Sequence, residues 1–140
     1  MVLQASKLTV GDTVEQVVVD GLTRTQLVMY AGASGDLNPL HTDEVYANQV
    51  AGFPSVFGHG MLTMAMTGRA VTDYVGDGRL RKFGGRFSGQ VWPGDTLTTR
   101  LVVESIHGNG DEHVATLTVV TLNDHGETVF SGSAEARVDP

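Results

Sequence analysis

The second half of the chain contains three strand-like runs separated by short turn sequences. The runs span residues 97–105, 114–122 and 129–138, and each is rich in β-branched residues with partial alternation of apolar and polar positions. Gly108-Asn109-Gly110 and Asn123-Asp124-His125-Gly126, which lie between the runs, contain residues that tolerate a positive φ. Strands joined by such turns predict an antiparallel meander, so we expect a β-sheet in the fold.

Two further strands and one apolar helix complete the predicted core. The strands span residues 14–19 and 86–91, and Pro93-Gly94-Asp95 ends the second. Residues 61–71 are apolar around most of a helical circumference, which is typical of a helix buried on several sides. A buried helix packed against a sheet is an α+β architecture, and the length suits a single domain over residues 1–140.

Two shorter helices are predicted before the apolar one. Thr23 and Gln26 have the spacing of a capping box, so a helix should begin there and stop at the glycines within residues 32–35. Thr42 is the expected N-cap of the next helix, which should end by Gly52.

Composition and charge argue against several kinds of function. Sixteen acidic and nine basic residues give a net charge of −7, which argues against a nucleic-acid partner. The chain has no cysteine, which excludes disulfides and a cysteine nucleophile. No apolar run approaches the roughly 20 residues of a membrane-spanning helix, and the first residues do not resemble a signal peptide. We therefore expect a cytoplasmic protein without a membrane partner.

The loop after the first predicted helix concentrates chemically active side chains. Asp36, Asn38 and His41 supply a carboxylate, an amide and an imidazole, and Pro39 restricts the backbone between them. A carboxylate and an imidazole that face one water can remove one proton and deliver another, as hydration of a polarised double bond requires. Equally, Asp36 and Asn38 could cap a turn while His41 lies on the surface. A metal site is the weakest alternative, because residues 36–43 have no recognised zinc or calcium spacing.

A second candidate site lies at the start of the apolar helix. His59-Gly60 precedes the helix, where unpaired backbone amides and the positive end of the helix dipole point outward. Because Gly60 has no side chain, a substrate carbonyl could approach these amides closely, which would form an oxyanion site. The alternative is that Gly60 only begins the helix.

The loop and the helix start together match a known pattern. The run YAGASGDLNPLHTD, residues 30–43, is followed eighteen residues after His41 by His59-Gly60-Met61-Leu62. This pattern closely resembles the MaoC-like hydratases, a family that includes the R-specific enoyl-CoA hydratases and the 3-hydroxyacyl thioester dehydratases. The resemblance extends from residues 8–12 through Arg86-Phe87 to the last strands, and it favours the catalytic interpretation of the loop.

The resemblance implies a fold, a set of roles and a reaction. The fold is the hot-dog fold, in which a curved antiparallel sheet wraps one long helix, here residues 61–75, and two such units form a dimer. Asp36 and His41 would hold the catalytic water, Asn38 would support the loop, and the Gly60 amide would receive the thioester oxygen. The implied enzyme is a hydro-lyase of fatty-acid metabolism that interconverts trans-2-enoyl and (R)-3-hydroxyacyl thioesters of coenzyme A or acyl carrier protein. We expect no cofactor and no metal.

One position departs from the better-known enoyl-CoA hydratases. These carry a serine eight residues beyond the glycine matched to Gly60, where this chain has Gly68. Thr67 would point about 100° away on a helix and would not replace that serine. Glycine leaves space, and the departure resembles the dehydratase subunits of long-chain and mycolic-acid synthesis.

Several polar residues are expected to contact the substrate. They are Asn38, His59 and a basic cluster of Arg79, Arg81, Lys82 and Arg86. The cluster could hold the phosphates of coenzyme A or the acidic surface of an acyl carrier protein, or it could form a solvated loop.

Three other functions would be compatible with the fold. The chain could be a hot-dog acyl thioesterase, a non-catalytic subunit that shapes an acyl channel, or the catalytic half of a heterodimer. The non-catalytic alternative is disfavoured because such subunits tend to lack the aspartate and histidine found here.

Overall fold

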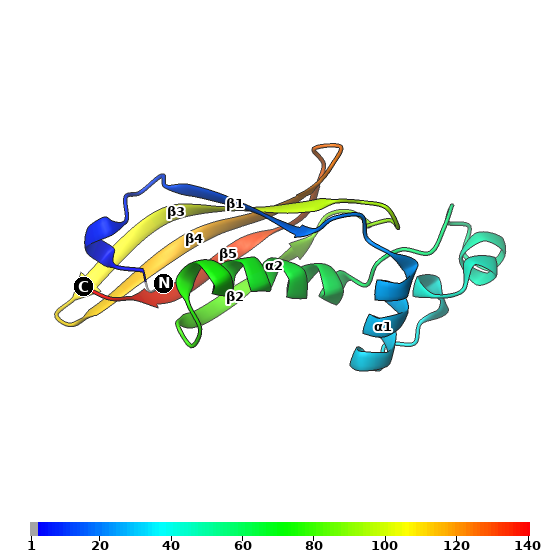
Figure 1. The fold of residues 1–140 in the computed structure, drawn as a ribbon, viewed down its shortest axis with the longest axis horizontal. Coiled ribbons are helices and arrows are strands. Elements are labelled where there is room, and N and C mark those ends of the chain that lie inside the picture. The colour runs from blue at the N-terminus through cyan, green and yellow to red at the C-terminus, as the bar shows by residue number, and fades with distance from the viewer. Residues whose placement is uncertain (1–2) are drawn as a thin grey trace.

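The structure is a computed structural model that describes residues 3–140, apart from the side chain of Asn109. Its main element is a five-stranded sheet (Figure 1). The strands are β1 Thr13–Val19, β2 Leu80–Phe87, β3 Leu97–Asn109, β4 Glu112–Asn123 and β5 Thr128–Val138. Their order in the sheet is β1-β3-β4-β5-β2, and every neighbouring pair is antiparallel. The predicted meander of β3, β4 and β5 is confirmed, as is the strand predicted over residues 14–19.

The two hairpin turns use glycines in the left-handed region. Gly110 has a φ of 66° between β3 and β4, and Gly126 has a φ of 79° between β4 and β5. Alternate residues of β3 then face the core, because side chains alternate along a strand. Leu97, Leu101 and Val103 are each at most 2% exposed.

The strand predicted over residues 86–91 is wrong in position, because the sheet contains residues 80–87 instead. Gly84 and Gly85 disfavour a strand by propensity, so local sequence preference does not predict a strand at these residues. In the structure, however, Gly85 lies so close to β5 that a Cβ there would be 2.6 Å from Cζ of Phe130. Glycine is therefore the residue that allows β2 to pair with β5.

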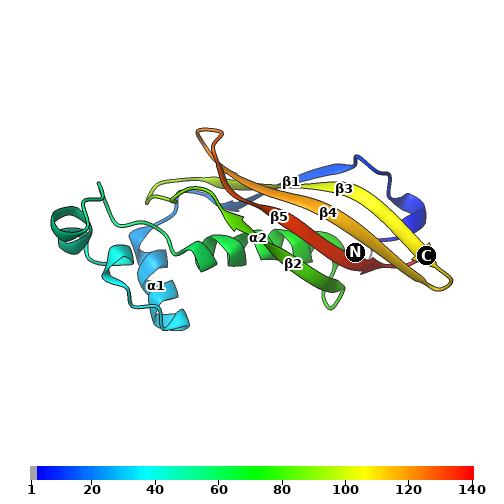
Figure 2. The ribbon, with the colours of Figure 1, turned by 180° about the vertical axis from the view of Figure 1, so that it is seen from behind.

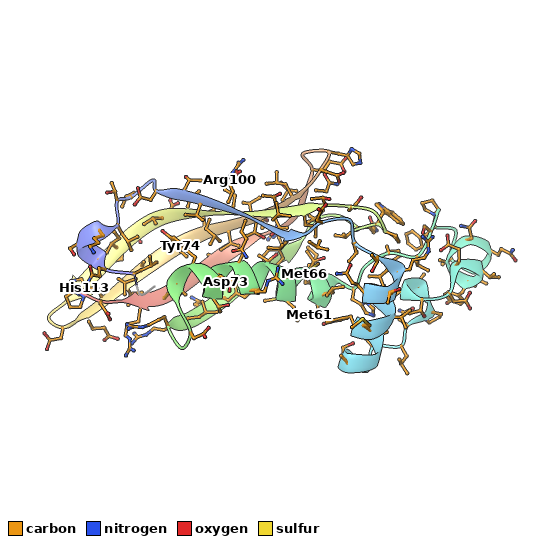
Figure 3. The ribbon with its side chains drawn as sticks, in the orientation of Figure 1. Met61, Met66, Asp73, Tyr74, Arg100 and His113 are labelled. Carbon is orange, nitrogen blue, oxygen red and sulfur yellow. The ribbon has the colours of Figure 1, made fainter. Side chains whose placement is uncertain are left out.

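The long helix α2, Gly60–Val75, lies along one face of the sheet and contacts β1, β2, β3 and β5 (Figures 1 and 2). This is the α+β hot-dog arrangement that the resemblance implies. The prediction that this helix is buried on several sides is wrong for the single chain, because the sheet covers only one side of the helix. The buried residues form one stripe of Thr63, Thr67, Ala70, Val71 and Val75. Met61, on another side, is 56% exposed (Figure 3).

A group of short helical segments lies at one end of the molecule, next to the N-terminal end of α2 (Figures 1 and 2). The helix α1, Arg24–Ser34, has both halves of the capping box between Thr23 and Gln26, and Gly35 ends it with a φ of 75°. Both predictions are confirmed. A 3-10 turn, η2, follows at Pro39–His41.

The helix predicted from Thr42 exists, but its cap is one residue later. The carboxylate of Asp43 accepts a hydrogen bond from the Tyr46 amide (3.0 Å), and the helical turn ends as a π-helix, η3, Tyr46–Val50. A further 3-10 turn, η1, spans Ala5–Lys7. Within residues 3–140, the helices are too short or too polar to cross a membrane.

Candidate active site

The loop between α1 and η2 is held by bonds between its own side chains and backbone. Asp36 Oδ1 accepts a hydrogen bond from the Asn38 amide (3.3 Å), and Asn38 Oδ1 accepts one from the Leu40 amide (3.1 Å). The capped turn that was the alternative to a catalytic loop is therefore present. It does not exclude catalysis, because the second carboxylate oxygen of Asp36 is not used in it.

His41, the last residue of η2, is only 8% exposed, so its expected alternative position on the surface is wrong. Its Nδ1 lies 2.6 Å from the carbonyl oxygen of Phe57. A carbonyl oxygen only accepts, so Nδ1 carries the proton and donates it to this bond. In the neutral imidazole, Nε2 of His41 then carries the lone pair and can accept a proton.

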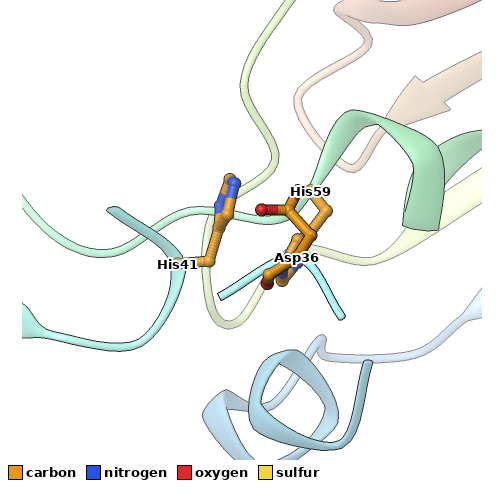
Figure 4. Close-up of side chains that lie close together, drawn as sticks. All are labelled: Asp36, His41 and His59. Atoms are coloured by element: carbon orange, nitrogen blue, oxygen red, sulfur yellow. The ribbon is translucent and has the colours of Figure 1, made fainter. Parts of the chain in front are cut away.

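Asp36, His41 and His59 come together from three segments of the chain (Figure 4). One carboxylate oxygen of Asp36 and one ring nitrogen of each histidine lie within 4.8 Å of one another. Two groups at such a separation can both reach one water molecule, which is the geometry required for paired proton transfers.

His59 lies against the ring of His41 and is only 1% exposed. The two imidazole rings are stacked with centroids 3.8 Å apart, and Nε2 of His59 donates a hydrogen bond to the backbone oxygen of Asp36 (3.1 Å). Tyr30 also packs against the His59 ring, in a T-shaped arrangement with centroids 4.8 Å apart. Burial lowers the pKa of His59 below its ordinary value, and His41 lowers it further, against the opposing effects of Asp36. His59 is buried in this position, and its expected contact with a substrate stays a prediction.

The stacking also bears on metal binding by these three residues. Imidazole lone pairs lie in the ring plane, and the planes of His41 and His59 differ by only 27°. Two nearly parallel planes do not direct their lone pairs to one point at the roughly 2.0–2.1 Å of a metal–imidazole bond. The cluster is thus better arranged for proton transfer than for metal coordination.

Gly60 is the first residue of α2 and His59 is its N-cap. The amides of Leu62 and Thr63 both donate to the His59 carbonyl, at 3.1 and 3.3 Å. The amides of Gly60 and Met61 are therefore the ones that the helix N-terminus presents to a ligand. This is the arrangement expected of an oxyanion site.

Gly60 and His41 line different hollows in the single chain. Gly60 lines a cavity of about 370 Å³ together with Phe57, Phe87 and Ser88. His41 lines a smaller one of about 150 Å³ beside Arg24.

The basic cluster is not one free positive patch. Arg79 pairs with Asp139 (2.5 Å), Arg81 with Glu112, and Lys82 with Glu135 (3.4 Å). Among the residues that the structure describes, Arg86 is the member without an ion pair. Arg81, Lys82 and Arg86 belong to β2 rather than to a solvated loop. Substrate binding by the cluster stays a prediction, and three members would first have to leave an acidic partner.

The space expected above Gly68 is filled. A Cβ built on Gly68 would be 3.1 Å from Cε1 of Phe83. Thr67 is fully buried, and its hydroxyl lies 2.7 Å from that of Thr121 on the sheet. As predicted, Thr67 does not take the place of a serine at position 68.

Sequence reasoning did not find the contacts that three aromatic residues make around the site. Phe57 supplies the carbonyl that orients His41, Tyr30 packs on His59, and Phe87 lies over Gly60. Tyr30 and Phe87 lie in segments that carry the family resemblance, which is a usable signal. No sequence signal identifies a backbone carbonyl as the partner of a particular histidine.

Comparison with known proteins assigns the chain to a family. It is 39% identical over 84 residues, 58% of its length, to 3-hydroxyacyl-thioester dehydratase Y of Mycobacterium tuberculosis, and covers 29% of that protein. It is 30% identical over 116 residues, 81% of its length, to the peroxisomal enoyl-CoA hydratase 2 of Arabidopsis thaliana, and covers 34% of it. The chain thus spans about a third of these relatives. The structure of the R-hydratase PhaJ1 from Pseudomonas aeruginosa matches with a TM-score of 0.83 and 27% identity, over 98% of this chain and 86% of that one. Residues 5–124 match the family model described as MaoC like domain, and the chain therefore belongs to this family.

Proposed function

We propose that this chain is a hydro-lyase that adds water reversibly to trans-2-enoyl thioesters and forms (R)-3-hydroxyacyl thioesters. The observation that carries the proposal is the placement of the Asp36 carboxylate and a His41 ring nitrogen within 4.8 Å of each other. The names of its relatives, a 3-hydroxyacyl-thioester dehydratase, an enoyl-CoA hydratase and an R-hydratase, support the same reaction class.

The proton transfers follow from the tautomer of His41. Because the Phe57 carbonyl holds a proton on Nδ1, Nε2 is the His41 nitrogen that can exchange a proton with a water molecule held between the ring and the Asp36 carboxylate. One of these two groups takes a proton from the water as its oxygen bonds to C3 of the substrate. The C2–C3 double bond becomes single, and the proton returns to C2, so both groups end as they began. Dehydration is the same sequence reversed.

The N-terminus of α2 supplies the electrophilic part of the site. A thioester oxygen at the Gly60 amide would gain negative charge as water adds to C3, and the amide and the helix dipole stabilise that charge. Stabilisation of the developing charge, more than of the ground state, is what lowers the barrier.

We propose that a second hot-dog unit, a copy of this chain or a related chain, completes the site. In the single chain, Asp36 is exposed, Leu37 is 71% exposed, and His41 and Gly60 line separate hollows. A covered site strengthens these electrostatic interactions because it excludes water. Light scattering of the purified chain, with activity measured on the same sample, distinguishes a homodimer from an obligate heterodimer.

The reaction is tested with enoyl thioesters of increasing chain length on coenzyme A and on acyl carrier protein. Loss of enone absorbance reports hydration, and chiral analysis of the product reports its configuration. Asp36→Asn and His41→Ala are each expected to lower kcat by about 10² to 10⁴ with the fold retained. Unchanged rates in both variants would exclude the proposal, and release of free thiol from acyl-CoA would indicate a thioesterase instead.

A further inference from the structure

We infer that His59 is a positioning residue, which holds the Asp36 backbone and the His41 ring in their reactive arrangement without contacting the substrate. The inference rests on the proposed hydratase activity. It assigns a role to the residue that directly precedes the oxyanion glycine, and that role differs from the substrate contact expected from the sequence.

The first contact of His59 is with the ring of His41. Their centroids are 3.8 Å apart, and the edge of Tyr30 packs on His59 with centroids at 4.8 Å. His41 is also held at Nδ1 by the Phe57 carbonyl. A ring that is fixed at one nitrogen and supported on one face has little freedom to turn, so the direction of its Nε2 lone pair is set before a substrate arrives.

The second contact is with the backbone of Asp36. Nε2 of His59 donates a hydrogen bond to the Asp36 carbonyl oxygen at 3.1 Å. That carbonyl follows directly on the Cα from which the carboxylate projects, so the bond restrains the peptide plane beside the catalytic side chain. One buried ring thus restrains both members of the acid–base pair, although they lie five positions apart in the sequence.

The other ring nitrogen of His59 argues that the residue does not serve stability. Nδ1 is buried, and within the described part of the chain it has no hydrogen-bond partner. A buried polar atom without a partner lowers stability, so His59 makes its contacts with His41 and Asp36 at a cost to the stability of the fold.

The charges around His59 favour a neutral ring. The titratable groups that face it are Asp36, His41 and Tyr30. Burial and the neighbouring His41 lower the pKa of His59. A neutral His59 also places no positive charge beside His41, so it does not oppose proton uptake at Nε2 of His41.

The first test measures tautomers in the unsubstituted protein and does not depend on activity. Imidazole nitrogen chemical shifts at pH 7 should show His59 neutral with its proton on Nε2, and His41 with a proton on Nδ1. A proton on Nδ1 of neutral His59, or a charged His59, would overturn the inference because neither matches the bond to Asp36.

The second test compares two amide substitutions. A glutamine at position 59 can place an N–H donor where Nε2 lies, whereas an asparagine reaches only the position of Nδ1. His59→Gln keeps the donor to Asp36 but loses the ring stacked on His41, so it should lower kcat by no more than about tenfold. His59→Asn loses both contacts and should lower kcat by about tenfold more than His59→Gln, with KM changed less than about threefold in both variants.

A matched control is available at the opposite end of the molecule. His113, in β4, also has a buried Nδ1 without a partner among the described residues (Figure 3). His113→Asn should leave kcat unchanged. Equal losses in the two His59 variants, or a raised KM with unchanged kcat, would contradict a positioning role. If the unsubstituted protein fails to hydrate any enoyl thioester, the proposed function fails, while the tautomer measurement still tests the contacts of His59.

Discussion

The ring of Phe83 lies against Gly68, so that a Cβ added at Gly68 would be only 3.1 Å from Cε1 of Phe83. Phe83 belongs to the edge strand β2, and its ring also packs on Phe130 with centroids 5.8 Å apart. An aromatic side chain of the sheet therefore occupies the space that glycine leaves on the helix. Gly68 does not by itself create an empty acyl pocket.

This contact predicts opposite effects of alanine at two helical glycines. Gly68→Ala should destabilise the protein by about 1–2 kcal/mol, because overpacking against Phe83 exceeds the gain in helix propensity. Gly32→Ala in α1, where a Cβ would meet no atom within 4 Å, should stabilise it by about 0.5–1 kcal/mol. Urea unfolding measures both. In the double variant that also carries Phe83→Leu, most of the stability lost through Gly68→Ala should be restored. If the two substitutions changed the free energy of unfolding additively, contact between Gly68 and Phe83 would not be the cause.

The Gly60 amide can be removed without disturbing the helix. Gly60 is the first residue of α2, where proline is favourable, and His59 has φ −60° and ψ 135°, which suit a residue before proline. Gly60→Pro should therefore fold normally but lower kcat by about 10² to 10³, the effect of losing one oxyanion donor.

Gly60→Ala is the control for this change, because it adds the same Cβ, 3.4 Å from the Phe87 ring, and keeps the amide. Steady-state kinetics and thermal unfolding of both variants distinguish loss of the donor from crowding. A similar fall in kcat for Gly60→Pro and Gly60→Ala would show that the added Cβ, and not the loss of the amide donor, causes the effect.

Three buried threonine hydroxyls link the helix to the sheet. Thr121 Oγ1 lies 2.7 Å from that of Thr67 and 2.8 Å from that of Thr99, and all three residues are fully buried. Thr121→Val should cost roughly 2–5 kcal/mol, because it leaves two buried hydroxyls without this partner. Thr99→Val, which leaves the Thr67–Thr121 pair intact, should cost about 1 kcal/mol. Equal losses of stability in the two variants, measured by chemical denaturation, would contradict this hydrogen-bond arrangement.

The lowered pKa of His59 predicts how stability depends on pH. In the unfolded chain this imidazole has its ordinary pKa of 6.5, whereas in the folded protein burial lowers it. Below pH 6.5 the unfolded state therefore binds more protons, so the free energy of unfolding falls as the pH falls towards the folded-state pKa. His59→Gln should lose less stability than the unsubstituted protein between pH 7 and pH 5 in urea titrations. Parallel curves would indicate that His59 titrates normally in the fold.

Local patterns in the sequence predicted the elements whose signals are themselves local. The capping box at Thr23, the stop at Gly35 and the meander of β3 to β5 depend on hydrogen bonds and turn geometry between near neighbours. The edge strand β2 was misplaced because its glycines are favoured only by close contact with β5. Burial of α2 was overestimated because the sheet in one chain covers only one side of it.

The candidate catalytic residues also divide into those with a local sequence signal and those whose role depends on tertiary contacts. The sequence by itself identified Asp36, His41 and Gly60, because their residue types and spacing carry a specific motif. Tertiary structure alone decided that Phe57 sets the tautomer of His41, that His59 stacks behind it, and that Asp139, Glu112 and Glu135 pair with three of the clustered basic residues. These are contacts between segments distant along the chain, and their geometry exists only once the helix has packed on the sheet.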